Sequence, residues 1–143
     1  MHDTFNLSRF VEAQGPVFSR VMSELHAGRK ASHWMWFIFP QLQGLGRSEM
    51  ASRFAISGTA EARAYLAHAL LGPRLEECVR TVLQHRDRSA AQIFGSPDDM
   101  KFRSCLTLFM NAGPGSLLYE QALEQFYSGE PDRQTLLLLN HQQ

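Results

Sequence analysis

The sequence predicts an all-α fold, a single compact bundle of short helices spanning residues 1–143. Apolar side chains recur mostly at intervals of three and four residues, which is the period of a helix with one buried face. Glycine and proline separate these segments at short intervals, and the sequence contains no internal repeat or interdomain linker. The 143 residues, of which 44% are hydrophobic and 20% charged, suffice for one domain with a sizeable core.

The amino-terminal residues predict two helices. Asn6 is expected to cap a short helix whose apolar face includes Phe10. Pro16 suits the first position of a second helix, because its fixed backbone angle fits a helix start. Gly28 is expected to end this second helix, since glycine adopts the left-handed conformation that commonly follows a helix.

Residues 32–40 form the most apolar segment, Ser-His-Trp-Met-Trp-Phe-Ile-Phe-Pro. Ser32 can cap a short helix here, and Pro40 disfavours helical geometry at Phe39. A buried strand is the alternative, because aromatic residues and isoleucine favour sheets. We prefer the helix, since no partner strand is evident elsewhere in the sequence. The glycine-containing residues 42–47 that follow predict a loop.

Further helices are expected at residues 48–54, 60–68, 71–86, 89–95, 97–111 and 116–127, with a final turn or two after Asp132. The clearest start signal is Ser96-Pro97-Asp98-Asp99, which combines a capping serine, a proline and two acids favoured by the helix dipole. The side chains expected in the core are Trp36, Phe39, Phe102, Leu106 and Phe109.

Charge and composition exclude several classes of protein. The 14 basic and 14 acidic residues give no net charge, whereas nucleic-acid binders usually carry a basic excess, so no nucleic-acid partner is expected. No run approaches the roughly 20 apolar residues of a membrane span, and no secretory signal begins the sequence, so no membrane partner and a cytoplasmic location are expected. Cys78 and Cys105 are then expected to be buried thiols. Arg29-Lys30 and Arg86-Asp87-Arg88 are expected to be solvated turn charges, and the alternative for Arg29-Lys30 is that this pair guards the mouth of a pocket.

Motifs for common cofactors are missing from the sequence. The six histidines include no His-x-x-x-His pair and the two cysteines form no Cys-x-x-Cys, so no metal site is expected. A phosphate-binding Gly-x-x-x-x-Gly-Lys-Ser/Thr motif is also absent, and Gly44-x-Gly46 is too short for a dinucleotide fingerprint. We therefore expect no cofactor.

Three segments resemble one known family. They are Phe-Val-Glu-Ala-Gln at 10–14, the run SHWMWFIFPQLQGLG at 32–46, and Phe-Gly-Ser-Pro-Asp-Asp-Met-Lys at 94–101 with its continuation to Phe109. Over residues 5–127 the chain resembles the bacterial family catalogued as domain of unknown function 1810. The resemblance implies a small all-α protein without a settled activity. Some members carry the label calpastatin, but this sequence has no disordered inhibitor repeats.

The resemblance has two limits. The family's serine pair in the late helix is here Ser104-Cys105, which leaves no hydroxyl at the second position. The tail after Gly129 is not assigned by the resemblance.

The first candidate site segment runs from His33 to Gly46. His33 and Trp36 are three residues apart, so they share a face of a helix, and Gln41, Gly44 and Gly46 follow. Aromatic rings can stack on a flat ligand group while loop amides reach phosphate oxygens. The structural alternative is that His33 bonds a helix end and both tryptophans belong to the core.

The second segment carries Asp98, Lys101 and Ser104, which form a polar stripe at helical spacing opposite Phe102 and Leu106. A lysine between an acid and a hydroxyl can bind phosphate as a point charge or assist proton transfer. The alternative is an exposed Asp–Lys pair that contributes a few tenths of a kcal/mol.

Two functions from different classes follow. In the first, a cleft between residues 33–41 and 98–111 binds a small phosphate-bearing metabolite of nucleotide or ADP-ribose type, with or without hydrolysing it. Lys101 would hold the phosphates, and Asp98 or His33 would orient a water. His33 and Lys101 should then meet across a cleft floored by Trp36, with Gln41 and Ser104 at its rim. In the second, the aromatic segment is a partly exposed face of a protein-interaction module.

Overall fold

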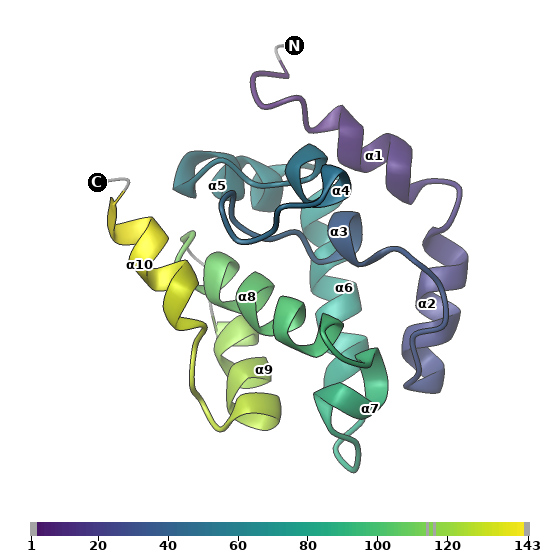
Figure 1. The fold of residues 1–143 in the computed structure, drawn as a ribbon. Coiled ribbons are helices and arrows are strands. Elements are labelled where there is room, and N and C mark those ends of the chain that lie inside the picture. Colours follow the sequence, from purple (N-terminus) through teal and green to yellow (C-terminus); the bar gives the residue numbers. More distant parts are fainter. Residues whose placement is uncertain (1–2, 114, 116, 142–143) are drawn as a thin grey trace.

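The protein is described by a computed structural model over residues 3–113, 115 and 117–141, and this part is all-α, as predicted (Figure 1). Its helices are α1 (Ser8–Gln14), α2 (Phe18–Ala27), α3 (Met35–Ile38), α4 (Glu49–Arg53), α5 (Thr59–Ala67), α6 (Leu71–Leu83), α7 (Ala90–Phe94), α8 (Asp98–Met110), α9 (Leu117–Tyr127) and α10 (Arg133–His141). No helix in these residues is long and apolar enough to cross a membrane.

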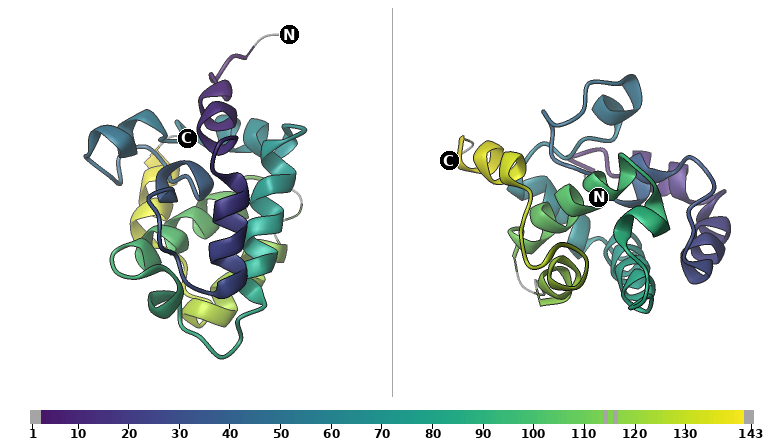
Figure 2. Two further views of the ribbon diagram at one scale, coloured as in Figure 1. Left: turned by 90° about the vertical axis from the view of Figure 1, so that its right-hand side faces the viewer. Right: turned by 60° about the horizontal axis from the view of Figure 1, so that its bottom comes forward.

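Helix α8 lies at the centre and packs against α5, α7, α9 and α10 (Figure 1). Helix α6 packs against α2, which runs alongside it (Figure 2), and also against α5 and α9. Aromatic rings join these layers: the Phe102 ring of α8 lies 4.9 Å from Phe39 and 4.7 Å from Phe94, between ring centroids. Two turns further along α8, the centroid of the Phe109 ring lies 5.3 Å from that of Tyr65. The centre of the core is therefore aromatic.

The apolar segment after Ser32 forms a helical turn, α3, rather than a strand. It ends at Ile38, and Phe39, which precedes Pro40, has a non-helical φ of −124° and ψ of 71°, as predicted. Among the described residues the β-pairing is limited to a parallel bridge between Leu42 and Ile56. In it the Gln43 amide donates to the Ile56 carbonyl at 2.8 Å, and the Ile56 amide donates to the Gln41 carbonyl at 2.9 Å. The bridge holds the loop after α3 against the segment after α4.

Several predicted helix ends are confirmed. Gly28 follows α2 with a φ of 73°, in the left-handed region that glycine favours. Ser48 accepts a hydrogen bond from the Ala51 amide at the start of α4, and Ser89 begins α7 in a capping box with Gln92. Asp132 accepts from the Thr135 amide at 3.0 Å at the start of α10. The start predicted at Ser116 lies outside the described residues.

The caps predicted at Asn6 and Ser96 are wrong. Asp3 caps α1 in place of Asn6, because its carboxylate accepts hydrogen bonds from the Leu7 and Ser8 amides at 2.6 and 2.9 Å. Ser96 does not cap α8: the helix begins at Asp98, and Pro97, which occupies the capping position, has no side-chain acceptor. Three boundaries also move, since α2 begins at Phe18 rather than at Pro16, α6 ends at Leu83 and α5 already includes Thr59.

The core prediction is confirmed for Phe39, Phe102, Leu106 and Phe109, each of which has no exposed surface. It is wrong for Trp36, which is only partly buried; Trp34, 1% exposed, fills the core instead. Both cysteines are buried thiols, and burial raises the pKa of Cys78 to about 12.

Candidate functional site

The two candidate segments meet at Trp36. Lys101 of α8 places its Nζ 5.5 Å from the centroid of the Trp36 ring. The same ammonium lies 3.3 Å from Oδ1 of Asp98, one turn earlier on α8. The side chain of Lys101 keeps 28% of its surface exposed, so its charge is accessible beside a partly exposed aromatic ring.

A second lysine, Lys30, joins Asp98 and Lys101 in one charged cluster, although the sequence analysis did not count it among the site residues. Lys30 Nζ lies 2.9 Å from Asp98 Oδ2 and donates to the Ser32 carbonyl at 2.6 Å. It also lies 5.1 Å from the centroid of the Trp34 ring. With 8% of its side chain exposed, Lys30 is buried, so its prediction as a solvated turn charge is wrong. Burial is tolerable because Asp98 compensates the charge.

Composition could have indicated this cluster. Lys30 and Lys101 are the only lysines among the 14 basic residues, and Trp34 and Trp36 are the only tryptophans. Each lysine lies over one tryptophan, and both contact Asp98. Lysine carries a compact ammonium with three donors, which binds phosphate as a point charge, whereas arginine presents a planar fork. The two lysines are therefore concentrated at one place in a chain that otherwise uses arginine.

Glu24 of α2 fixes the segment that carries Lys30 and Trp34. Its Oε1 accepts hydrogen bonds from the Ala31 amide at 2.7 Å, the Ser32 amide at 2.9 Å and the Trp34 indole Nε1 at 2.9 Å. Its Oε2 accepts from the Ser32 hydroxyl at 2.6 Å. Partial burial raises the pKa of Glu24, but these four hydrogen bonds lower it more, to about 2. Ser32 thus donates to Glu24 and does not cap α3, which corrects the prediction.

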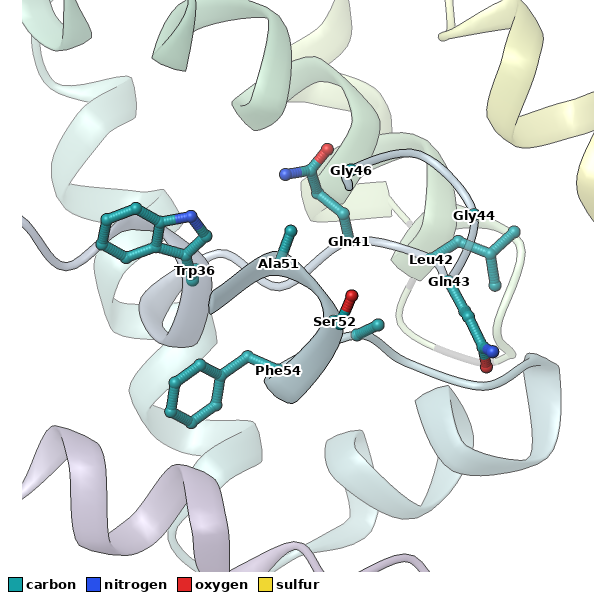
Figure 3. A pocket seen from close by; sticks show the side chains of 10 residues that line it. Trp36, Gln41, Leu42, Gln43, Gly44, Gly46, Ala51, Ser52 and Phe54 are labelled. Atoms are coloured by element: carbon teal, nitrogen blue, oxygen red, sulfur yellow. The ribbon is translucent and has the colours of Figure 1, made fainter. Parts of the chain in front are cut away.

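A small pocket lies beside Trp36 (Figure 3). Trp36 lies at one end, loop residues Gln41–Gly46 form a wall, and α4 with the residues after it forms the floor. The cavity has a volume of about 80 Å³, and its lining side chains are uncharged. Pockets for whole drug-sized ligands measure about 300–1,000 Å³. This pocket can therefore enclose only a small, neutral part of a ligand.

Glycine is required at positions 44 and 46 for different structural reasons. Gly44 has a φ of 102°, a conformation that residues with a side chain rarely adopt. A Cβ at Gly46 would lie 2.5 Å from the Cβ of Ala51, so only glycine lets the loop approach α4 so closely. Both glycines shape the pocket wall.

Ser104 does not lie at the pocket rim, and no contact in the described residues links His33 to the pocket. Ser104 is 7% exposed, and its hydroxyl donates to the Met100 carbonyl at 3.1 Å, so it faces its own helix rather than the pocket rim. His33 is exposed, and within the described residues no hydrogen bond or ion pair joins it to Lys101. The structure thus brings together Trp36, Gln41, Gly44 and Gly46 around the pocket, and Asp98 and Lys101 beside Trp36.

A family model described as "Protein of unknown function (DUF1810)" matches residues 4–139. The chain belongs to this family. The match continues beyond residue 127 and includes most of α10, which the sequence resemblance left unassigned. No curated protein matches the chain.

A solved structure also resembles this family member. It is the crystal structure of the conserved hypothetical protein Rv1873 from Mycobacterium tuberculosis, with a TM-score of 0.95 and 52% sequence identity. The similarity covers 96% of this chain and 99% of the other. The shared fold therefore extends over nearly the whole chain, and neither name assigns a reaction.

Two further observations bear on function. The aromatic segment does not form an exposed face, because Trp34, Met35, Phe37, Ile38 and Phe39 are each at most 8% exposed. Of the aromatic rings in this segment only Trp36 is partly exposed, so the segment offers little apolar surface to a partner. In the part of the chain that the structure describes, no group of three or more His, Cys, Asp or Glu side chains could hold a metal ion.

Proposed function

We propose that this protein binds a small phosphate-bearing metabolite of nucleotide or ADP-ribose type at the Trp36 pocket and the lysines beside it. The observation that carries this proposal is the position of Lys101, with its Nζ 5.5 Å from the centroid of the ring that borders the pocket. An accessible cation next to an aromatic ring and a glycine loop suits a ligand with a flat ring and a phosphate.

The size of the pocket defines how such a ligand would lie. A cavity of about 80 Å³ without charged side chains accepts a small neutral group, and Gln41 and the loop backbone supply hydrogen-bonding groups for it. The remainder of the ligand would extend over Trp36 toward Lys101, where its phosphate would be paired. The proposal concerns binding and does not include a reaction, because both carboxylate oxygens of Asp98 already contact lysines. Hydrolysis, with His33 or Asp98 orienting water, and a cytoplasmic location stay predictions.

The first experiment is a thermal-shift screen with nucleotides, ADP-ribose and sugar phosphates. A ligand that binds only the folded state at 100 times its Kd stabilises it by about 2.7 kcal/mol, a shift of several degrees. Lys101→Met should abolish the shift. The control Arg133→Met removes an exposed positive charge from α10 and should retain it.

Amine acetylation gives a direct readout, because the chain contains only two lysines. Bound nucleotide should reduce acetylation of Lys101, measured by mass spectrometry, while buried Lys30 reacts slowly with or without it. If no phosphate compound shifts the melting temperature, or if a bound one leaves Lys101 fully reactive, the proposal is wrong.

A further inference from the structure

Three uncharged polar side chains line the Trp36 pocket. They belong to Gln41, Gln43 and Ser52, and among the described residues no hydrogen bond or ion pair engages any of these side chains. The backbone of the same loop is held in place, because the Gln41 carbonyl accepts from the Ile56 amide at 2.9 Å and the Gln43 amide donates to the Ile56 carbonyl at 2.8 Å. The pocket therefore combines a fixed backbone with side-chain donors and acceptors that a ligand can engage.

Gln41 is the best placed of these side chains to recognise a ligand group. It lies between Trp36 and Gln43 along the pocket (Figure 3). It is partly buried, whereas Gln43 and Ser52 are exposed. A hydrogen bond away from water is electrostatically stronger than one at an exposed position. A group that enters the pocket beside Trp36 is therefore expected to pair with the Gln41 carboxamide.

A carboxamide discriminates between the neutral groups that a nucleotide offers. Its carbonyl accepts and its NH₂ donates, side by side, so its best partner has an adjacent donor and acceptor. The amide and amidine edges of nucleobases have this pattern, and glutamine pairs in this way with N6 and N7 of adenine. A sugar hydroxyl offers one oxygen, and a phosphate offers acceptors only. The base is therefore the part of a nucleotide that matches Gln41.

The size and lining of the pocket agree with this partner. Its volume of about 80 Å³ equals that of two or three water molecules at about 30 Å³ each, so it admits the edge of a base and not the whole ring. Because no charged side chain lines it, a phosphate inside it would be buried without a counter-charge. The Trp36 ring at one end is available to contact the flat part of the base that stays outside.

We infer, on the basis of the proposed function, that the pocket recognises the amide or amidine edge of a nucleobase and that the Gln41 carboxamide pairs with this edge. The base enters the pocket, and the phosphate of the same nucleotide extends past Trp36 to Lys101. Gln41 is then a specificity-determining residue. It favours nucleotides over sugar phosphates, and it favours bases with an adjacent donor and acceptor over bases with acceptors alone.

The test compares three phosphate monoesters by isothermal titration calorimetry. AMP and purine riboside 5′-phosphate differ only in the 6-amino group, which is the donor of the adenine edge, so Lys101 contributes equally to both. AMP should bind about three- to tenfold more tightly, the range that one neutral hydrogen bond supplies. Ribose 5-phosphate, which has no base, should bind roughly tenfold more weakly than AMP, because it lacks both the edge and the ring.

Two variants assign this preference to one side chain. Gln41→Met removes the donor and the acceptor while keeping the length of the side chain and the backbone hydrogen bonds of the bridge. It should bring the affinities for AMP and purine riboside 5′-phosphate to within about twofold of each other. Gln84→Met makes the same change at an exposed position at the end of α6 and should keep the wild-type ratio.

The outcomes separate this inference from the proposed function. Circular dichroism and the melting temperature report whether Gln41→Met folds; if it does not, the preference of the wild type still decides. If purine riboside 5′-phosphate or ribose 5-phosphate binds the wild type as tightly as AMP, the inference is overturned while the proposed function stands. The same holds if Gln41→Met folds and keeps the wild-type ratio. If none of the three compounds binds and the wider screen is also empty, the proposed function itself fails.

Discussion

Replacing Glu24 by glutamine should destabilise the protein through a loss of charge alone. Glutamine has the same shape, so an amide oxygen at the Oε1 position can still accept from the Ala31 and Ser32 amides and from the Trp34 indole. Hydrogen bonds to a charged group contribute about 1.5–3 kcal/mol each, against about 0.5–1.5 for neutral ones. Because Glu24 is partly exposed and the four bonds are not independent, we expect a total loss of about 2 kcal/mol at pH 7.

The pH dependence of this loss provides the sharper measurement. The folded-state pKa of Glu24, about 2, lies below its ordinary value of 4.5. Its contribution to stability is therefore fully present above pH 4.5 and disappears as the pH falls toward 2. Urea unfolding followed by tryptophan fluorescence, repeated between pH 7 and pH 3, should show the difference between wild type and Glu24→Gln shrinking below pH 4.5.

A matched control tests the same substitution where little is expected. Glu76 pairs with Arg80 on the surface of α6, and exposed pairs of this kind contribute about 0.3–0.5 kcal/mol, so Glu76→Gln should be nearly neutral. The reasoning about Glu24 is refuted if Glu24→Gln costs no more than this control, or if its cost is the same at pH 3 as at pH 7.

Three further predictions test how deeply individual aromatic rings and thiols are buried. Phe102→Ala should lower the free energy of unfolding by about 3–5 kcal/mol, measured in urea, because its ring is fully buried between Phe39 and Phe94; a loss below 1 kcal/mol would contradict this packing. Both thiols should resist an aromatic disulfide reagent at pH 8 until urea is added, since burial raises the pKa of Cys78 to about 12 and that of Cys105 well above its ordinary value; rapid native reaction would disprove their burial. Trp36→Phe should remove most of the tryptophan emission that acrylamide quenches, whereas Trp34→Phe should not; the opposite pattern would exchange their assigned environments.

Local sequence signals predicted the fold well. Ser48, Ser89 and Asp132 each cap a helix that begins at the next residue, so neighbouring residues suffice to identify them. The stripe of Phe102, Leu106 and Phe109 follows helical periodicity, and the burial of all three is confirmed. These features depend on contacts within one or two turns of a helix.

The site depended on contacts that local patterns do not contain. Glu24 accepts from the Trp34 indole ten residues later in the chain, and Trp34 is buried while Trp36 is only partly buried. Lys30 looks like a solvated turn charge until α8 brings Asp98 beside it. The pocket likewise requires the close approach of Gly46 to Ala51, which only the folded chain reveals. Periodicity paired Asp98 with Lys101 and Trp36 with His33, but it did not reveal that Lys30 also contacts Asp98.

Ligand binding beside Trp36 can be observed most directly by nuclear magnetic resonance, because the two tryptophans give two indole N–H signals. The Trp34 signal serves as an internal control, since its ring is buried and its N–H donates to Glu24. Titration with ADP-ribose and cyclic AMP should shift the Trp36 signal progressively to saturation while the Trp34 signal moves little. Millimolar concentrations of these nucleotides that leave Trp36 unmoved, or that shift Trp34 and remote residues instead, would contradict binding at this site.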